Sequence, residues 1–119
     1  MYAVIRNGRA ETKRALVLST EDGGGPLFDG ARFHVTPEGR LFVFYYAYGK
    51  GADGSNLSGN RLLEITPGGQ SEPVKLEMKS PIKRFFTASW RVGCAASDIL
   101  DVYGAAKNGG MSYARIRLK

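Results

Sequence analysis

The stretch ARFHVTPEGRLFVFYYAY, residues 31–48, shows the most complete β-hairpin pattern in the chain. Polar and apolar residues alternate over 32–35, as in a half-buried strand. The turn sequence TPEG follows at 36–39, where Pro presets its own φ and Gly accepts a φ that other residues avoid. Residues 41–48 are rich in Phe, Tyr and β-branched side chains, which suit a pleated sheet. We therefore predict two strands joined by a tight turn.

Other apolar runs of strand length lie on both sides of this hairpin. Gly- and Pro-rich segments separate them, and the chain contains 16 glycines in all. The segment most tolerant of a helix, 10–18, carries no sustained apolar face of helical period. We predict an all-β chain with further strands over 2–6, 14–20, 60–66, 73–78, 84–90, 99–103 and 112–118.

Composition and charge limit the classes of protein to which this chain can belong. The chain of 119 residues is one small domain in length, with 43% hydrophobic and 24% charged residues. Its net charge of +6 permits binding of nucleic acids or acidic glycans. The basic residues are scattered rather than clustered, which favours a solvated basic surface over a nucleic-acid-binding module.

Neither a membrane helix nor a cofactor motif is visible in the sequence. No apolar run approaches the roughly 18 residues of a transmembrane helix, and the first residues are too short for a signal-peptide core. The single cysteine, Cys94, cannot form an internal disulfide and leaves the compartment open. A nucleophilic role for Cys94 would need a base, and His34 is the only histidine. We expect no metal and no cofactor.

An internal repeat organises the strands. Three pairs of strands, each an apolar strand, a polar loop and a second strand, recur about every 50 residues, the length of a four-stranded propeller blade. In the first pair, a basic loop follows residues 2–6. We predict antiparallel four-stranded blades of a partial β-propeller, about two to two and a half blades in all. The complete blade covers 31–80, and blade fragments cover 1–25 and 82–119.

Residues 19–24, STEDGG, resemble the front of an Asp-box, the turn between the third and fourth strands of sialidase-type blades. The usual Trp does not follow, and ITPGG at 65–69 is a more degraded counterpart. The segments FFTASWRVGCAASDILDVYG and SYARIRL are similar to the last blades of bacterial sialidase-like proteins with BNR repeats. The resemblance implies the C-terminal blades of a glycan-acting propeller. It implies an arginine cluster for the substrate carboxylate, but no FRIP-type arginine motif is present.

Blade topology predicts which residues face a ligand. The starts of inner strands and the ends of second strands share one face of a propeller. This rule selects six candidate ligand-binding residues, Arg32, His34, Tyr46, Tyr48, Arg84 and Tyr103. Arginine suits an anion, and tyrosine suits stacking on a sugar ring. The alternatives are an exposed strand-end arginine and a hydrogen-bonded structural histidine.

Three hypotheses for function follow from these patterns. The first is a sialidase-like propeller fragment that binds or acts on glycans, without a complete catalytic set of its own. The second is a non-catalytic β module that associates with itself to complete its blades, because partial blades leave apolar faces exposed. The third, a basic nucleic-acid-binding domain, rests on net charge alone and ranks last.

Overall fold

The computed structural model describes residues 2–14, 28–50, 54–88 and 94–118. These residues form strands, turns and connecting segments, and none of them lies in a helix that could cross a membrane. All strand pairs are antiparallel, so the all-β prediction is confirmed. The strands are β1 (Tyr2–Arg6), β2 (Arg9–Arg14), β3 (Phe28–Val35), β4 (Leu41–Ala47), β5 (Gly59–Thr66), β6 (Gly69–Gln70), β7 (Val74–Lys75), β8 (Ile82–Ala88), β9 (Ile99–Ala106) and β10 (Met111–Arg117).

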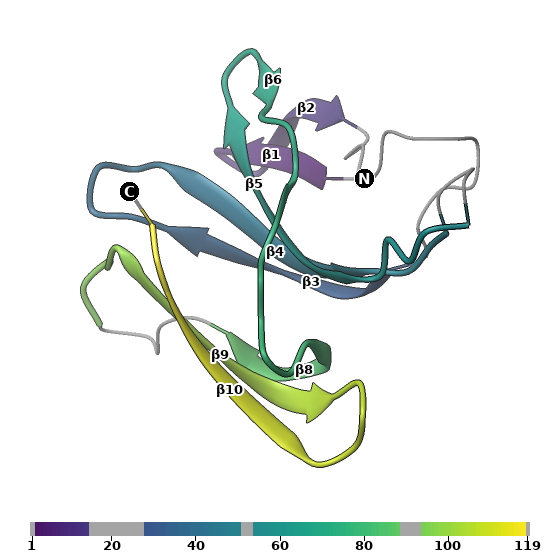
Figure 1. Ribbon diagram of the computed structural model, residues 1–119. Helices are drawn as coiled ribbons and strands as arrows, with labels where there is room; N and C mark the ends of the chain where they lie inside the picture. The colour runs from purple at the N-terminus through teal and green to yellow at the C-terminus, as the bar shows by residue number, and fades with distance from the viewer. Residues whose placement is uncertain (1, 15–27, 51–53, 89–93, 119) are drawn as a thin grey trace.

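The strands form three sheets in which sequence neighbours are spatial neighbours. The first sheet is the pair β1 and β2. In the second sheet, β3, β4 and β5 lie side by side, and both β6 and β7 pair with β5. The third sheet has the strand order β8–β9–β10. Figure 1 shows the second sheet between the β1–β2 hairpin and the third sheet. The described residues form neither a closed barrel nor a propeller ring. The fold is therefore a series of antiparallel meanders.

The predicted hairpin of residues 31–48 is present as β3 and β4. In the turn, the Gly39 amide donates to the Thr36 carbonyl at 2.9 Å and the Thr36 amide donates to the Arg40 carbonyl at 3.0 Å. Gly39 has φ 79°, the left-handed conformation that the turn requires of glycine. β3 begins earlier than predicted, at Phe28, and a bulge between Phe28 and Ala31 precedes the regular ladder.

β4 lies at the centre of the protein and is buried on both faces. Its side chains Phe42, Phe44 and Tyr46 pack toward the third sheet, and Val43, Tyr45 and Ala47 pack on the opposite face. The larger cluster, between the second and third sheets, contains Phe42, Phe44, Tyr46, Ile82, Phe85, Leu100, Val102 and Leu118. The continuous apolar run of β4 follows from this burial, because a strand covered on both faces needs no polar alternation.

Two strand predictions are wrong at the margins of this core. The segment predicted as a basic loop after residues 2–6 is β2, because Asn7 and Gly8, with φ 49° and 74°, form a tight hairpin turn. The strand predicted over 73–78 is reduced to β7, because β6 and β7 share the edge of β5. The predicted strand 14–20, apart from Arg14, and the Asp-box residues 19–24 lie outside the described residues.

The strands of the third sheet differ from the predicted ones in their bounds. β8 begins at Ile82 rather than at residue 84, and β9 continues to Ala106 rather than ending at 103. Gly104 permits close contact between β8 and β9, since a Cβ at this position would overlap the Arg84 carbonyl oxygen. Residues 89–90 of the strand predicted over 84–90 lie outside the described residues.

Candidate ligand-binding site

Three of the six candidate residues lie between the second and third sheets. Arg32 pairs with Phe44 and His34 with Phe42 across the β3–β4 ladder. Directly paired residues of an antiparallel ladder point to the same face of the sheet. Arg32, His34 and Tyr46 therefore share the face that packs on β8–β10.

The Arg32 guanidinium is engaged with backbone groups of two sheets. It donates to the Ala31 carbonyl at 3.0 Å and to the Phe85 carbonyl at 3.2 Å. Its central carbon also lies 5.9 Å from the centroid of the Phe85 ring, a cation–π contact. Arg32 thus connects β3 to β8, and an anionic ligand would have to replace these contacts.

His34 links the second sheet to the segment before β9 through a hydrogen bond. Its side chain is 2% exposed, and Nε2 lies 2.6 Å from the Ser97 carbonyl oxygen. Because a carbonyl only accepts, Nε2 carries the proton of this bond. The other ring nitrogen, Nδ1, is buried without a hydrogen-bond partner among the described residues. His34 lines a pocket of about 380 Å³ with Cys94, Asp101 and Arg115, among others.

Tyr46 and Tyr48 lie together, but the Tyr46 ring is inaccessible. The two rings meet edge to face with centroids 4.9 Å apart, and Lys83 Nζ lies 5.2 Å from the Tyr48 ring centroid. Tyr46 is 1% exposed, and burial raises the pKa of its hydroxyl. A sugar could stack on Tyr46 only if the two sheets separated.

The remaining candidates, Arg84 and Tyr103, lie on the outer face of the third sheet. Arg84 pairs with Ala105, and Tyr103 is two residues away on the same side of β9. Both side chains are exposed. The structure therefore separates Arg84 and Tyr103 from the four candidates at the second sheet.

Tyr103 belongs to a cluster that we call the tyrosine face, made of Asp101, Tyr103, Tyr113 and Arg115. Tyr103 pairs with Tyr113 and Asp101 with Arg115 across the β9–β10 ladder. The two tyrosines are 41% and 60% exposed. The sequence interpretation missed Tyr113 and Arg115, although the alternation in SYARIR at 112–117 places both on one side of a strand.

Hydrogen bonds fix the polar groups of the tyrosine face. The Tyr113 hydroxyl donates to Asp101 Oδ1 at 2.6 Å. Arg115 donates to both carboxylate oxygens of Asp101, at 2.8 Å from Nε and 3.1 Å from Nη2. The bonds from Arg115, and then from Tyr113, lower the pKa of Asp101, so its carboxylate is ionised at neutral pH. The face therefore presents aromatic rings beside an ordered ion pair.

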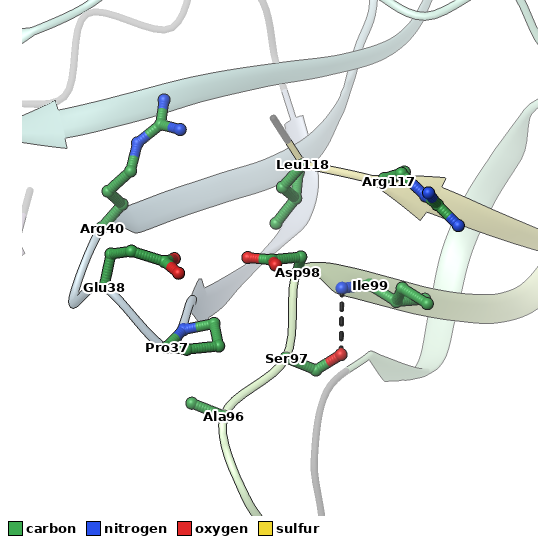
Figure 2. Close-up of a pocket in the computed structure, with 9 residues that line it drawn as sticks. All are labelled: Pro37, Glu38, Arg40, Ala96, Ser97, Asp98, Ile99, Arg117 and Leu118. Carbon is green, nitrogen blue, oxygen red and sulfur yellow. Dashed lines mark hydrogen bonds between the residues drawn. The ribbon is translucent and has the colours of Figure 1, made fainter.

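A second concave region lies at the turn between β3 and β4. This pocket of about 700 Å³ includes Glu38 from the turn and Asp98 from the start of β9, whose carboxyl groups face one another in Figure 2. Arg40 lies at the rim of the pocket and forms a bidentate ion pair with Glu64. Its Nε donates to Oε1 at 2.9 Å, and its Nη2 donates to Oε2 at 2.8 Å. A hydrogen bond from its own backbone amide is the main cause that lowers the pKa of Glu38. Arg117 also lines this pocket, so acidic and basic side chains are mixed in it.

The described residues contain no group of three or more His, Cys, Asp and Glu side chains arranged to hold a metal ion. Comparisons with protein families, with curated proteins and with solved structures find no match to this chain.

Proposed function

We propose that this chain is a non-catalytic glycan-binding β module whose ligand lies on the tyrosine face. The observation that carries this proposal is the exposed, directly paired Tyr103 and Tyr113 beside the Asp101–Arg115 ion pair. Tyrosine rings offer flat apolar surfaces for the C–H face of a sugar ring, and the hydrogen bond from the Tyr113 hydroxyl to Asp101 holds one of these rings in place. The carboxylate and guanidinium groups offer an acceptor and donors for sugar hydroxyls.

The composition of this face favours a polar ligand over a further sheet. The two buried faces of β4 are almost wholly aromatic and aliphatic. On the tyrosine face, a carboxylate and a guanidinium stand next to the tyrosines, and a sheet packed there would remove both charges from water. A glycan brings hydroxyl groups that replace those waters. The face therefore suits a sugar better than a covering sheet.

Binding rather than hydrolysis is proposed because three arginines of the candidate sites already have partners. Arg32 bonds to backbone carbonyls, Arg40 to Glu64 and Arg115 to Asp101. A sialidase-like anion clamp would need several guanidinium groups free to meet one carboxylate. The resemblance to sialidase-type blades also leads us to propose an arrangement of the strands. In it, β3, β4, β5 and β7 form one propeller blade, and β8–β10 form part of the next blade.

A glycan array probed with the purified chain tests the proposal. We expect binding to be reduced at least about tenfold in Tyr113→Ala and Tyr103→Ala, since stacking on one aromatic ring contributes about 1.5 kcal/mol. Phe33→Ala removes another exposed ring, 46% accessible, from a different sheet and serves as the control. Equal binding by all three variants, or no glycan bound by the unaltered chain, would contradict the proposal.

Self-association is a second proposal, favoured by the unequal sheets. β1–β2 contains two strands and β8–β10 contains three, whereas the second sheet contains five, β3–β4–β5 with both β6 and β7 on β5. Incomplete sheets leave strand edges that another copy can pair with. Light scattering during gel filtration tests this proposal: we expect a dimer or larger assembly at micromolar concentration, and a stable monomer would exclude it.

A further inference from the structure

A groove runs between β10 and the segment that connects β7 to β8. Its volume is about 660 Å³. Segment 76–80 forms one wall and β10 forms the other, and the Ser112 hydroxyl joins the walls by donating to the Ser80 carbonyl at 2.8 Å. Four of the groove's apolar side chains also pack against the large core cluster, namely Leu76, Met78, Ala114 and Ile116.

The backbone of β10 has an open hydrogen-bonding edge beside this groove. Among the described residues β10 pairs with β9 alone. At the two ends of the ladder, the Leu118 amide donates to Asp98 at 2.7 Å and the Ala106 amide donates to Gly110 at 3.0 Å. Bonded and non-bonded pairs alternate in an antiparallel ladder, so even-numbered residues of β10 point their amides and carbonyls at β9. Those of Tyr113, Arg115 and Arg117 point outward.

We propose that this edge binds an extended acidic peptide by strand addition. Outward amides and carbonyls spaced two residues apart match the backbone of an added strand. Every second side chain of that strand would enter the groove and meet Met78 and Ala114, so we expect the peptide to carry apolar residues at alternate positions. The added strand would lie beside Tyr113 and Arg115 on β10, whereas Tyr103 lies one strand further away on β9, so the peptide and glycan proposals share only the β10 part of the tyrosine face.

Charge determines which kind of strand the edge accepts. Lys79 borders the groove and Arg117 follows on β10, whereas the charge of Arg115, which also borders the groove, is balanced by Asp101. Glu77 is the acidic residue among the groove's lining side chains, and the whole chain carries +6. A strand from a second copy would bring the same positive charge, whereas an acidic peptide is attracted over a distance of about one Debye length, ~8 Å at physiological salt. We therefore assign the edge to an acidic partner.

Fluorescence anisotropy with labelled hexapeptides tests the assignment on the full chain. The acidic probe is Glu-Val-Glu-Val-Glu-Val, the basic control is Lys-Val-Lys-Val-Lys-Val, and Glu-Val-Pro-Val-Pro-Val cannot form a regular ladder. We expect the acidic probe to bind at least about tenfold more tightly than either control. Equal binding of the acidic and basic probes would overturn the charge argument, and binding of the proline probe would overturn strand addition.

Two pairs of variants locate the binding edge. Tyr113→Pro and Tyr113→Ala both lose the phenol, but only the proline removes the outward amide, so we expect at least about tenfold weaker binding for the proline variant than for the alanine variant. Met78→Glu places a like charge in the groove and should weaken binding of the acidic probe, whereas Val74→Glu, on the exposed side chain of β7, should not. Circular dichroism establishes that each variant is folded. Equal affinities within both pairs, or dimerisation of the chain through this edge without peptide binding, would refute the proposal.

Discussion

Replacing Asn60 by alanine should destabilise the protein strongly, because the side chain of Asn60 joins two sheets. Asn60 lies on β5 and is fully buried. Its Nδ2 donates to the Ile82 carbonyl at 2.9 Å, and the Ile82 amide donates to its Oδ1 at 2.8 Å. The side chain thus pairs with the backbone of β8 as another strand would, and it links the second sheet to the third.

The expected loss of stability follows from the backbone groups that Asn60→Ala leaves without a hydrogen-bond partner. The Ile82 amide and carbonyl would both lose their partner in a region without access to water. Each unsatisfied buried group costs about 1–3 kcal/mol, so the free energy of unfolding should fall by about 4 kcal/mol. A domain of this size loses a few degrees of Tm for each kcal/mol, which corresponds to a decrease of roughly 15 °C.

Urea unfolding followed by circular dichroism measures this change. Asn56→Ala is the matched control, because Asn56 is exposed and its Oδ1 accepts one hydrogen bond from the Ser58 amide at 3.0 Å. The control should lose less than about 1 kcal/mol. If Asn60→Ala also lost less than about 1 kcal/mol, the hydrogen-bonded link between Asn60 and Ile82 would not form in the folded protein.

Three further predictions concern the core and one surface ion pair. Gly104→Ala should reduce stability by about 3 kcal/mol in thermal unfolding, because the new Cβ would overlap the Arg84 carbonyl oxygen and lie 2.8 Å from its carbon; an unchanged Tm would contradict this close contact. Burial raises the pKa of Tyr45 to about 12, so the folded state keeps a proton that the unfolded chain loses above about pH 10, and stability should fall by about 3 kcal/mol between these pH values. Tyr45→Phe should remove much of that dependence, and an identical alkaline profile in both proteins would exclude Tyr45 as its source. Arg40→Ala should change stability little, because the ion pair with Glu64 is partly exposed, and a loss as large as that expected for Gly104→Ala in urea unfolding would contradict that expectation.

The local part of the fold could be predicted from the sequence because short-range chemistry determines it. The turn before Arg40 forms where Pro37 and Gly39 permit it, and the apolar run of β4 is a strand, as expected. β2 was missed because its residues are mostly charged or small, although Asn7 and Gly8 are a strong signal for a two-residue hairpin turn. Hydrophobic periodicity cannot identify a strand that lacks an apolar face.

Contacts between the sheets could not be predicted, because they join residues far apart in the sequence. Nothing in the neighbourhood of His34 indicates a bond to Ser97, and nothing near Asn60 indicates Ile82. The rule of blade ends selected Tyr103 but not Tyr113, since the pairing of these rings depends on the register of β9 with β10. The same rule selected Tyr46, whose burial follows from the packing of one sheet on another.

Changes of backbone amide chemical shifts in NMR spectra would show whether glycans bind to the tyrosine face. The isotope-labelled chain would be titrated with sialyllactose and, separately, with lactose. We predict that the amides that shift cluster at Asp101, Tyr103, Tyr113 and Arg115. Shifts confined to the pocket of Glu38 and Asp98, or no shifts with either sugar at millimolar concentration, would contradict the claim.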